Sequence, residues 1–256
     1  RLGEKYLLER LPETGIKYKI EFFIFKDTAN LMIDLSGVPL HKRGYRPETV
    51  DAPIRETLAA ALVKLARPRE GVLLWDPFCG SGTFPIEAAM MAANIAPGLM
   101  RGFTAQTWTN LIDPNEWKEV RIEARDNIDL SIETDIQGFD IDGTVIKAAK
   151  ENADAAGVLD LIHFQKRDVA DLAHPKKYGF IVTNPPYGER IEAEEGLYKT
   201  LGDRFKALDS WSMYVITGYE DAEKYLGRKA DKNRKIYNGM LKTYFLSYYG
   251  KRPERA

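Results

Sequence analysis

Short apolar runs alternate with longer amphipathic segments over most of the chain after residue 50, and this alternation limits the fold more than any other feature. Each apolar run has the length of a buried strand, and the segments between them have the apolar spacing of helices. Strands and helices that alternate in this way form a mostly parallel sheet, because each crossover helix returns the chain to the same edge. The sequence therefore predicts a doubly wound α/β sheet.

Apolar spacing, together with proline and glycine positions, places the expected elements. The predicted strands are Val72–Trp75, Ile136–Phe139, Leu161–Gln165, Tyr178–Thr183 and Met213–Thr217, followed by a hairpin over Arg234–Tyr248 that turns at Asn238-Gly239. The predicted helices are Ile54–Leu65, Thr83–Ala93, Asn115–Leu130, Gly143–Ala156 and Gly196–Ala207, and residues 97–114 form an irregular insertion. Before residue 50, two further strands, Lys17–Lys26 and Leu31–Leu35, flank a turn over Lys26–Asn30.

The composition is that of an ordinary globular protein. The 256 residues are 44% hydrophobic and 29% charged, which suits one large domain or two small ones. No apolar run approaches the length of a membrane span and no signal-peptide pattern is present, so we expect a cytoplasmic protein without a membrane segment. The single cysteine, Cys79, which we interpret as a small buried side chain, and three scattered histidines predict no disulfide and no structural metal.

A glycine-rich loop, residues 76–83 (DPFCGSGT), joins the first strand after residue 50 to the next helix. Its glycines let the backbone approach a ligand, and the helix N-terminus offers free N–H donors. The loop does not match a dinucleotide-binding fingerprint, because this chain has Pro85 where the fingerprint has its third glycine. It does not match a phosphate-binding loop either. The Asp76 carboxylate suits a cation-bearing cofactor such as S-adenosylmethionine, although a glycine turn needed only for packing is the alternative. The expected cofactor contacts are Asp76, Pro77, Phe78, Gly80, Gly82 and Thr83.

Acidic residues follow the next two strands. Asp140 ends the second strand, where a carboxylate holds the ribose hydroxyls in dinucleotide-binding folds. Asp168 follows the third strand and is suitably placed to accept the adenine amino group, with a solvated loop aspartate as its alternative. We interpret Asp142 as the cap of the following helix. The expected adenosine contacts are Asp140, Ile141, Asp168 and Val169.

The segment Asn184-Pro185-Pro186-Tyr187 directly follows the fourth strand and occurs by chance in about one of a thousand chains of this size. A base amine is a poor nucleophile because its lone pair is delocalised into the ring. Asn184 Oδ1 and the Pro185 carbonyl can accept both amine hydrogens and favour a pyramidal nitrogen that faces the methyl donor. Pro185 and Pro186 fix the carbonyl direction, while Tyr187 stacks on the base. We therefore expect these four residues to be catalytic, with Asn184 also contacting the cofactor.

Several motifs together resemble one family. They are residues 40–46 (LHKRGYR), 52–59 (APIRETLA), the glycine loop continuing into 86–89 (IEAA), 94–98 (NIAPG), 184–188 (NPPYG), and 229–232 (KADK) with 237–239 (YNG). This set is similar to the THUMP-containing RNA guanine-N2 methyltransferases, particularly the bacterial ribosomal large-subunit enzymes and their Gram-positive relatives. The resemblance implies the seven-stranded, Rossmann-like class I methyltransferase sheet with an antiparallel last strand, S-adenosylmethionine as donor and a guanine of 23S ribosomal RNA as substrate.

The resemblance also predicts how the chain is divided. Residues 1–36 correspond to the C-terminal part of a THUMP-like RNA-binding domain, 37–52 to a linker and 53–256 to the catalytic domain. A complete THUMP domain needs further residues, so either this chain is a catalytic fragment or the preceding residues are absent from the sequence.

Cations gather locally although the formal net charge is −1, and local basic patches suit an RNA partner. A cationic loop around residues 43–46 can hold RNA phosphate, close over the cofactor or act as a structural linker. Arg190 can contact the target nucleotide or pair with Glu194. The candidate RNA contacts are Arg43, Tyr45, Arg46, Arg190 and Arg234. The expected partner is 23S ribosomal RNA or its precursor, and the sequence indicates no particular oligomeric state.

Two alternatives remain open. An Asn-Pro-Pro-Tyr site also serves adenine N6 amines, and a related one serves a glutamine amide in protein. The other alternative is an RNA-binding assembly factor that keeps the fold without turnover, against which the intact set of Asp76, Asp140 and Asn184 argues.

Overall fold

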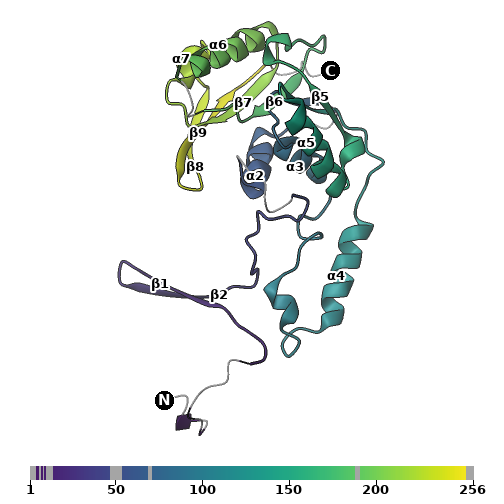
Figure 1. The fold of residues 1–256 in the computed structure, drawn as a ribbon, viewed down its shortest axis with the longest axis vertical. Helices are drawn as coiled ribbons and strands as arrows, with labels where there is room; N and C mark the ends of the chain where they lie inside the picture. The colour runs from purple at the N-terminus through teal and green to yellow at the C-terminus, as the bar shows by residue number, and fades with distance from the viewer. Residues whose placement is uncertain are drawn as a thin grey trace.

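The computed structural model describes residues 4, 5, 7, 9, 14–46, 54–68, 71–187 and 191–251, with the backbone alone for 191–194. Its main element is a seven-stranded sheet of order β5-β4-β3-β6-β7-β9-β8 (Figure 1). These strands are β3 (Leu73–Asp76), β4 (Ile136–Asp140), β5 (Ile162–Lys166), β6 (Gly179–Thr183), β7 (Ser212–Thr217), β8 (Lys232–Asn238) and β9 (Leu241–Tyr248). Neighbours are parallel from β5 to β7, and β9 is antiparallel to β7 and β8. The predicted class I methyltransferase sheet is confirmed.

Helices cover both faces of this sheet (Figure 1). The helices are α2 (Glu56–Ala66), α3 (Thr83–Ala92) and α5 (Gly143–Ala155) on one face, with α6 (Ile191–Ala207) and α7 (Ala222–Tyr225) on the other. The two cores follow the strand period, because Leu74 of β3 packs with α2, α3 and α5 while Leu73 and Trp75 pack with α6. A strand buried on both faces is continuously apolar, which is why the run Val72–Trp75 predicts β3.

The observed bounds differ from the predicted ones where periodicity is weak. Helix α6 begins at Ile191 rather than Gly196, and helix α4 (Pro114–Asp126) ends before Leu130. The short elements were not predicted, since a single turn carries little apolar period; they are α7, η1 (Thr104–Thr107), η2 (Leu159–Leu161) and η3 (Val169–Asp171). No helix in the described part of the chain is both long and apolar enough to cross a membrane.

The N-terminal strands β1 (Ile20–Phe25) and β2 (Thr28–Ile33) form a separate antiparallel hairpin. Lys26 and Asp27 make its turn with φ angles of 47° and 59°, so the turn is shorter than predicted. Every residue of both strands is exposed, and the hairpin projects away from the sheet (Figure 1). Its assignment to a THUMP-like domain stays a prediction, and the predicted end of the linker at residue 52 lies outside the described residues.

The insertion between α3 and β4 contacts the base of this hairpin. Trp108 is buried and its indole N–H donates to the Lys17 carbonyl at 3.0 Å. The Tyr18 ring lies 4.9 Å from the Trp108 ring, and its hydroxyl donates to Asn110 Oδ1 at 2.7 Å. The insertion therefore joins the hairpin to the seven-stranded sheet.

Candidate active site

The sequence-predicted site residues lie at one edge of the sheet. Asp76 and Asp140 end β3 and β4, Asp168 follows β5, and Asn184 follows β6. Because β3 to β6 are mutually parallel, their carboxyl ends share this edge. In the sheet, β4 lies on one side of β3 and β6 lies on the other. The boundary between β3 and β6 is therefore a topological switch point, and sheets of this kind bind ligands at such a point.

Asp76 is buried beneath this edge. Its Oδ1 accepts a hydrogen bond from the Thr183 hydroxyl at 2.6 Å and one from the Phe78 N–H at 3.2 Å. Burial raises the Asp76 pKa to about 7, and the nearby charge of Asp140 adds to the increase while both hydrogen bonds oppose it. A nearby cation would favour the charged form of this carboxyl.

The two glycines of the loop have different surroundings. Gly82 precedes α3 with a φ of 85°, and a Cβ atom there would stand 3.1 Å from both Ala149 Cβ and Phe164 Cζ. Gly80 also has a positive φ, 50°, but a Cβ atom at Gly80 would meet nothing within 4 Å. The Gly80 N–H donates to Asp140 Oδ2 at 3.1 Å, so the loop is tied to the end of β4. Gly82 therefore serves packing, whereas Gly80 leaves space above the loop.

The remaining loop residues are more varied in exposure. Pro77 and Cys79 are buried, which confirms the interpretation of Cys79 as a small filling side chain, and Phe78 is half-buried. Burial raises the pKa of the Cys79 thiol well above its ordinary value, so the thiolate is disfavoured. Thr83 is buried at the first turn of α3.

The acidic residues of the next two strand ends are fixed by local hydrogen bonds. Asp140 Oδ1 accepts from the Asp142 N–H at 3.0 Å, and Asp142 Oδ1 caps α5 by accepting from the Thr144 N–H at 2.8 Å, as predicted for Asp142. Asp168 Oδ1 accepts from the Ala170 N–H at 2.8 Å and thereby caps η3. Both Asp140 and Asp168 have a defined direction at the sheet edge.

Apolar side chains accompany these carboxylates. Ile141, next to Asp140, is 64% exposed, whereas Val169, next to Asp168, is buried. An exposed isoleucine at the end of a buried strand offers an apolar surface to a flat ring.

Asn184 has a buried, unpaired acceptor. Its Oδ1 is buried and has no hydrogen-bond partner among the residues that the structure describes. A buried carbonyl oxygen without a partner is costly and therefore marks a position where a ligand donor fits. Pro185 is buried, Pro186 is exposed and Tyr187 is half-buried.

Sequence reasoning missed two residues near Tyr187. Gly218, directly after β7, lies so close that a Cβ atom there would stand 2.8 Å from Tyr187 Cε2. Burial raises the pKa of the Tyr187 phenol, and the side chain of Asn238, at the end of β8, opposes this increase. The Asn238-Gly239 pair indicates a turn in the sequence, but nothing in it shows that the turn reaches the fourth strand.

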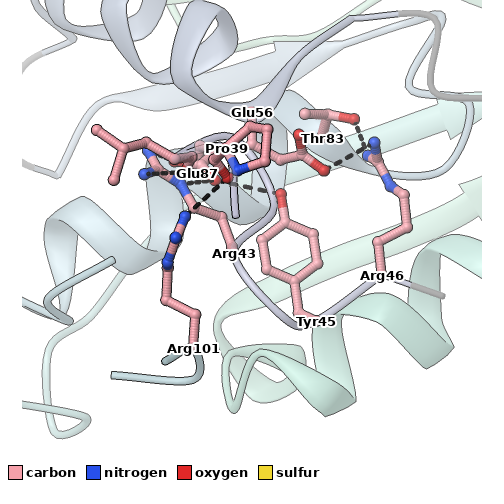
Figure 2. A network of polar contacts seen from close by, with 9 residues as sticks. Pro39, Arg43, Tyr45, Arg46, Glu56, Thr83, Glu87 and Arg101 are labelled. Atoms are coloured by element: carbon pink, nitrogen blue, oxygen red, sulfur yellow. Dashed lines mark hydrogen bonds and ion pairs between the residues drawn. The ribbon is translucent and has the colours of Figure 1, made fainter. Parts of the chain in front are cut away.

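The linker residues Arg43 and Tyr45 lie against Glu87 of α3 (Figure 2). Arg43 Nε and Nη2 donate to Glu87 Oε1 and Oε2 at 3.3 and 3.4 Å, and the Tyr45 hydroxyl donates to Oε1 at 3.2 Å. Burial raises the Glu87 pKa, against the effect of Arg43. Both side chains are largely buried and bonded, which favours the structural-linker alternative, and RNA binding by Arg43 and Tyr45 stays a prediction.

Arg46 is similarly committed. Its guanidinium donates to the Thr83 hydroxyl and pairs with Glu56 Oε1 at 3.0 Å, with both charged side chains 6% exposed (Figure 2). Arg46 therefore joins the linker to the first turns of α2 and α3, and its predicted contact with RNA stays a prediction. Arg101 completes the attachment of the linker by donating to the carbonyls of Pro39, Val38 and Ser36.

Two predicted RNA contacts lie elsewhere. Arg190 is outside the described residues. Arg234 is half-buried on β8, the edge strand of the sheet, where its role in RNA binding stays a prediction. Within the described part of the chain, no group of three or more His, Cys, Asp or Glu side chains is arranged to hold a metal ion.

Comparisons with known proteins agree with this geometry. The family model described as an RMKL-like methyltransferase domain matches residues 43–246. A Bacillus subtilis protein named as a candidate RNA methyltransferase, YpsC, is 45% identical over 96% of this chain and 64% of its own length. The ribosomal RNA large subunit methyltransferase K/L of Shewanella baltica is 39% identical over 91% of this chain and 34% of its own length.

A solved structure is also similar. The candidate methyltransferase SMU.472, complexed with SAH, superposes with a TM-score of 0.90 and 41% identity over 99% of this chain and 68% of that one. The chain thus spans less than two thirds of the two curated relatives, 64% of one and 34% of the other.

Proposed function

Because this chain belongs to the RMKL-like methyltransferase domain family, we propose that it transfers a methyl group from S-adenosylmethionine to the exocyclic 2-amino group of a guanine in 23S ribosomal RNA. The observation that carries the proposal is the buried Asn184 Oδ1 at the switch point of the sheet, which has no hydrogen-bond partner among the described residues. An amine hydrogen is the donor that this oxygen lacks.

The residues at the sheet edge fit S-adenosylmethionine. The space above Gly80 lies between the Asp76 and Asp140 strand ends, where the helix N-terminus and two carboxylates suit a cationic, ribose-bearing ligand. Asp140, already oriented by Gly80 and Asp142, keeps acceptor capacity for the two ribose hydroxyls. The complex of the SMU.472 relative with SAH, S-adenosylhomocysteine, supports the same ligand class.

The adenine ring fits the next two strand ends. Ile141 offers it an exposed apolar surface, and Asp168 Oδ2 can accept its amino group while Oδ1 remains on the Ala170 N–H. Val169, which follows Asp168, is buried, so we assign it a contact with the ring through its backbone. Asp76 lies deeper and acts on the ligand through its charge.

S-adenosylmethionine would supply a methyl group on a sulfonium sulfur, and the amine nitrogen would take this methyl group by in-line displacement with S-adenosylhomocysteine as the leaving group. The chain's own part is to activate and direct the amine. Asn184 Oδ1 and the Pro185 carbonyl accept the two amine hydrogens, which favours a pyramidal nitrogen with its lone pair toward the methyl carbon. Tyr187 stacks on the base and holds it in line. The methylated amine releases its extra proton to water, so no strong general base is required.

A guanine must leave its stack to reach this site, which unpaired RNA allows at low cost. RNA as substrate is supported by the names of the two curated relatives. Selection of the target rests on further residues, with the β1–β2 hairpin as part of a THUMP-like RNA-binding domain and Arg234 as a contact. If ribosomal RNA is the substrate, this chain acts in the cytoplasm.

The direct test is a nucleoside digest of 23S ribosomal RNA from cells with and without the gene, analysed by mass spectrometry. Loss of one N2-methylguanosine on deletion, and its return with the full-length gene, is the expected result. Loss of N6-methyladenosine, or of methylglutamine in a protein digest, would instead assign the site to those amines. Unchanged RNA and protein modification would contradict the proposal.

A further inference from the structure

The end of the β8–β9 hairpin projects beyond the sheet edge that carries the candidate active site (Figure 1). The last residue of β7, Thr217, pairs with Tyr244 of β9. Beyond this pair the hairpin continues, with Ile236 opposite Thr243, Tyr237 opposite Lys242 and Asn238 opposite Leu241. Because β7 is parallel to β6, its carboxyl end lies at the same edge as Asn184, and the hairpin end extends past that edge.

Two close approaches place the hairpin end beside the site. A Cβ atom at Gly218, directly after β7, would stand 2.8 Å from Tyr187 Cε2 and 3.6 Å from the Lys242 carbonyl oxygen, so Gly218 lies against both. At the turn of the hairpin, a Cβ atom at Gly239 would stand 3.7 Å from Nη2 of Arg55, the residue directly before α2. The hairpin end therefore borders the candidate active site.

One face of this hairpin combines aromatic rings with cations. Lys235 is opposite Tyr244 and Tyr237 is opposite Lys242, so the four side chains share a face. Lys235 Nζ lies 5.3 Å from the centroid of the Tyr237 ring, and Lys242 Nζ lies 5.1 Å from that of Tyr244. The Tyr237 side chain is 59% exposed. Within the described part of the chain Lys235 forms no ion pair, whereas Lys242 pairs with Glu220 at 3.0 Å.

This combination suits unpaired RNA. A base of any identity can stack on an exposed aromatic ring, and a lysine beside the ring can take the phosphate, whereas paired RNA hides the faces of its bases. Lysines on an edge strand also prevent pairing between copies, but that role needs no exposed ring between them. A second copy bound face to face would bring the lysines of both copies together, which like charges oppose.

We infer that the end of the β8–β9 hairpin binds the unpaired RNA that flanks the target nucleotide, with one base stacked on Tyr237 and a neighbouring phosphate beside Lys235. The hairpin end lies beside Tyr187, where the proposed function puts the target guanine, so the strand on one side of that guanine passes over it. This inference rests on the proposed function, since it takes RNA as the substrate.

The first test measures the Kd of the full chain for radiolabelled 23S ribosomal RNA, transcribed in vitro, by filter binding. Tyr237→Ala should raise this Kd at least about fivefold, the lower end of the loss from one base stack. Tyr237→Phe keeps the ring and should stay within about twofold of the parent. Tyr249→Ala is the matched control, because Tyr249 is an exposed tyrosine that follows β9 and lies outside the hairpin end.

The Kd for S-adenosylhomocysteine, measured by calorimetry, should be the same in all of these variants, which shows that the sheet is intact. An RNA affinity that Tyr237→Ala leaves unchanged would overturn the inference. An equal loss in Tyr237→Phe would overturn it too, because the hydroxyl rather than the ring face would then make the contact.

The salt dependence of RNA binding tests the phosphate contact. Lys235→Ala should make the slope of the logarithm of affinity against the logarithm of salt concentration shallower by about 0.7, the value for one phosphate of a single strand. Lys147→Ala, at an exposed position of α5, should leave the slope of the parent. A parental slope in Lys235→Ala would contradict the phosphate contact.

These measurements separate the inference from the proposed function, because binding is read without methyl transfer. A parent that binds RNA through Tyr237 but methylates no guanine would contradict the proposed function and leave the RNA contact in place. A parent that methylates guanine, with Tyr237→Ala binding RNA equally tightly, would contradict the inference alone. Sedimentation in which Tyr237→Ala dissociates a parental dimer, with RNA affinity unchanged, would assign the face to a second copy and overturn the inference.

Discussion

Arg46 Nη1 lies 3.0 Å from Glu56 Oε1, and this ion pair is almost fully buried where the linker meets α2. Removal of one partner leaves a buried charge without compensation, which costs about 3–5 kcal/mol. Arg46→Met should therefore lower the free energy of unfolding by about that amount, whereas Arg46→Met with Glu56→Met should recover most of it. Urea denaturation measures both.

The exposed pair Lys147–Glu151, 3.8 Å apart, is the matched control. Lys147→Met should change the free energy of unfolding by about 0.5 kcal/mol or less, because a solvent-exposed pair contributes little. If the double variant Arg46→Met with Glu56→Met is as unstable as Arg46→Met alone, the expected recovery is contradicted. The contacts between the linker and α2 would then depend on both charges.

Asn184→Ala should nearly abolish methyl transfer while leaving cofactor binding in place. Loss of one group that stabilises charge in the transition state lowers kcat about 100-fold to 1,000-fold. The Kd for S-adenosylhomocysteine, measured by calorimetry, should change much less, because Asn184 acts on the amine. An Asn184→Ala enzyme as fast as the parent would refute the mechanism.

Asp140 and Asp142 lie two residues apart but should respond differently to substitution. Asp140→Ala removes the acceptor proposed for the ribose hydroxyls, so the Kd for S-adenosylhomocysteine should rise at least about tenfold. Asp142→Ala removes the α5 cap and should cost about 1 kcal/mol of stability with little change in Kd. Calorimetry and thermal unfolding of both variants test the pair, and equal effects on Kd would contradict the separate roles.

The stability of the cofactor-free protein should depend on Asp76 through pH. Burial raises the Asp76 pKa from 3.8 to about 7, so between these values the folded state keeps a proton that the unfolded chain releases. The protonated Asp76 carboxyl therefore stabilises the folded state, and this stabilisation is complete below pH 3.8 and is lost as pH rises through 7.

Relative to Asp76→Asn, the parent should therefore lose on the order of a few kcal/mol of stability between pH 5 and pH 8. Denaturant unfolding at both values measures the difference, and Asp154→Asn, at an exposed position of α5, is the control. Parallel pH profiles for the parent and Asp76→Asn would show that Asp76 titrates normally.

Much of the fold could be predicted because its signals are local. The continuous apolar run of β3, the apolar period of α5 and the Asp142 cap each depend on neighbours in sequence. The order of Asp76, Asp140, Asp168 and Asn184 at successive strand ends then places them together, because parallel strands share an edge.

The remaining features depend on contacts between distant residues. Arg43 and Tyr45 form a basic-looking segment, but the burial of Glu87 in α3 draws both of them inward. The close approach of Gly218 to Tyr187 joins the loops that follow β6 and β7, which are separated by helix α6 in the sequence. Side-chain pattern alone contains neither pairing.

The exposed β1–β2 hairpin has a consequence for handling the protein. Phe22, Phe23, Ile24 and Leu31 are each more than half exposed, and within the described part of the chain the outer edges of β1 and β2 pair with no further strand. Apolar faces beside open edges favour strand pairing between copies. Colloidal stability of this chain should consequently fall with protein concentration, independently of how tightly its catalytic sheet is folded.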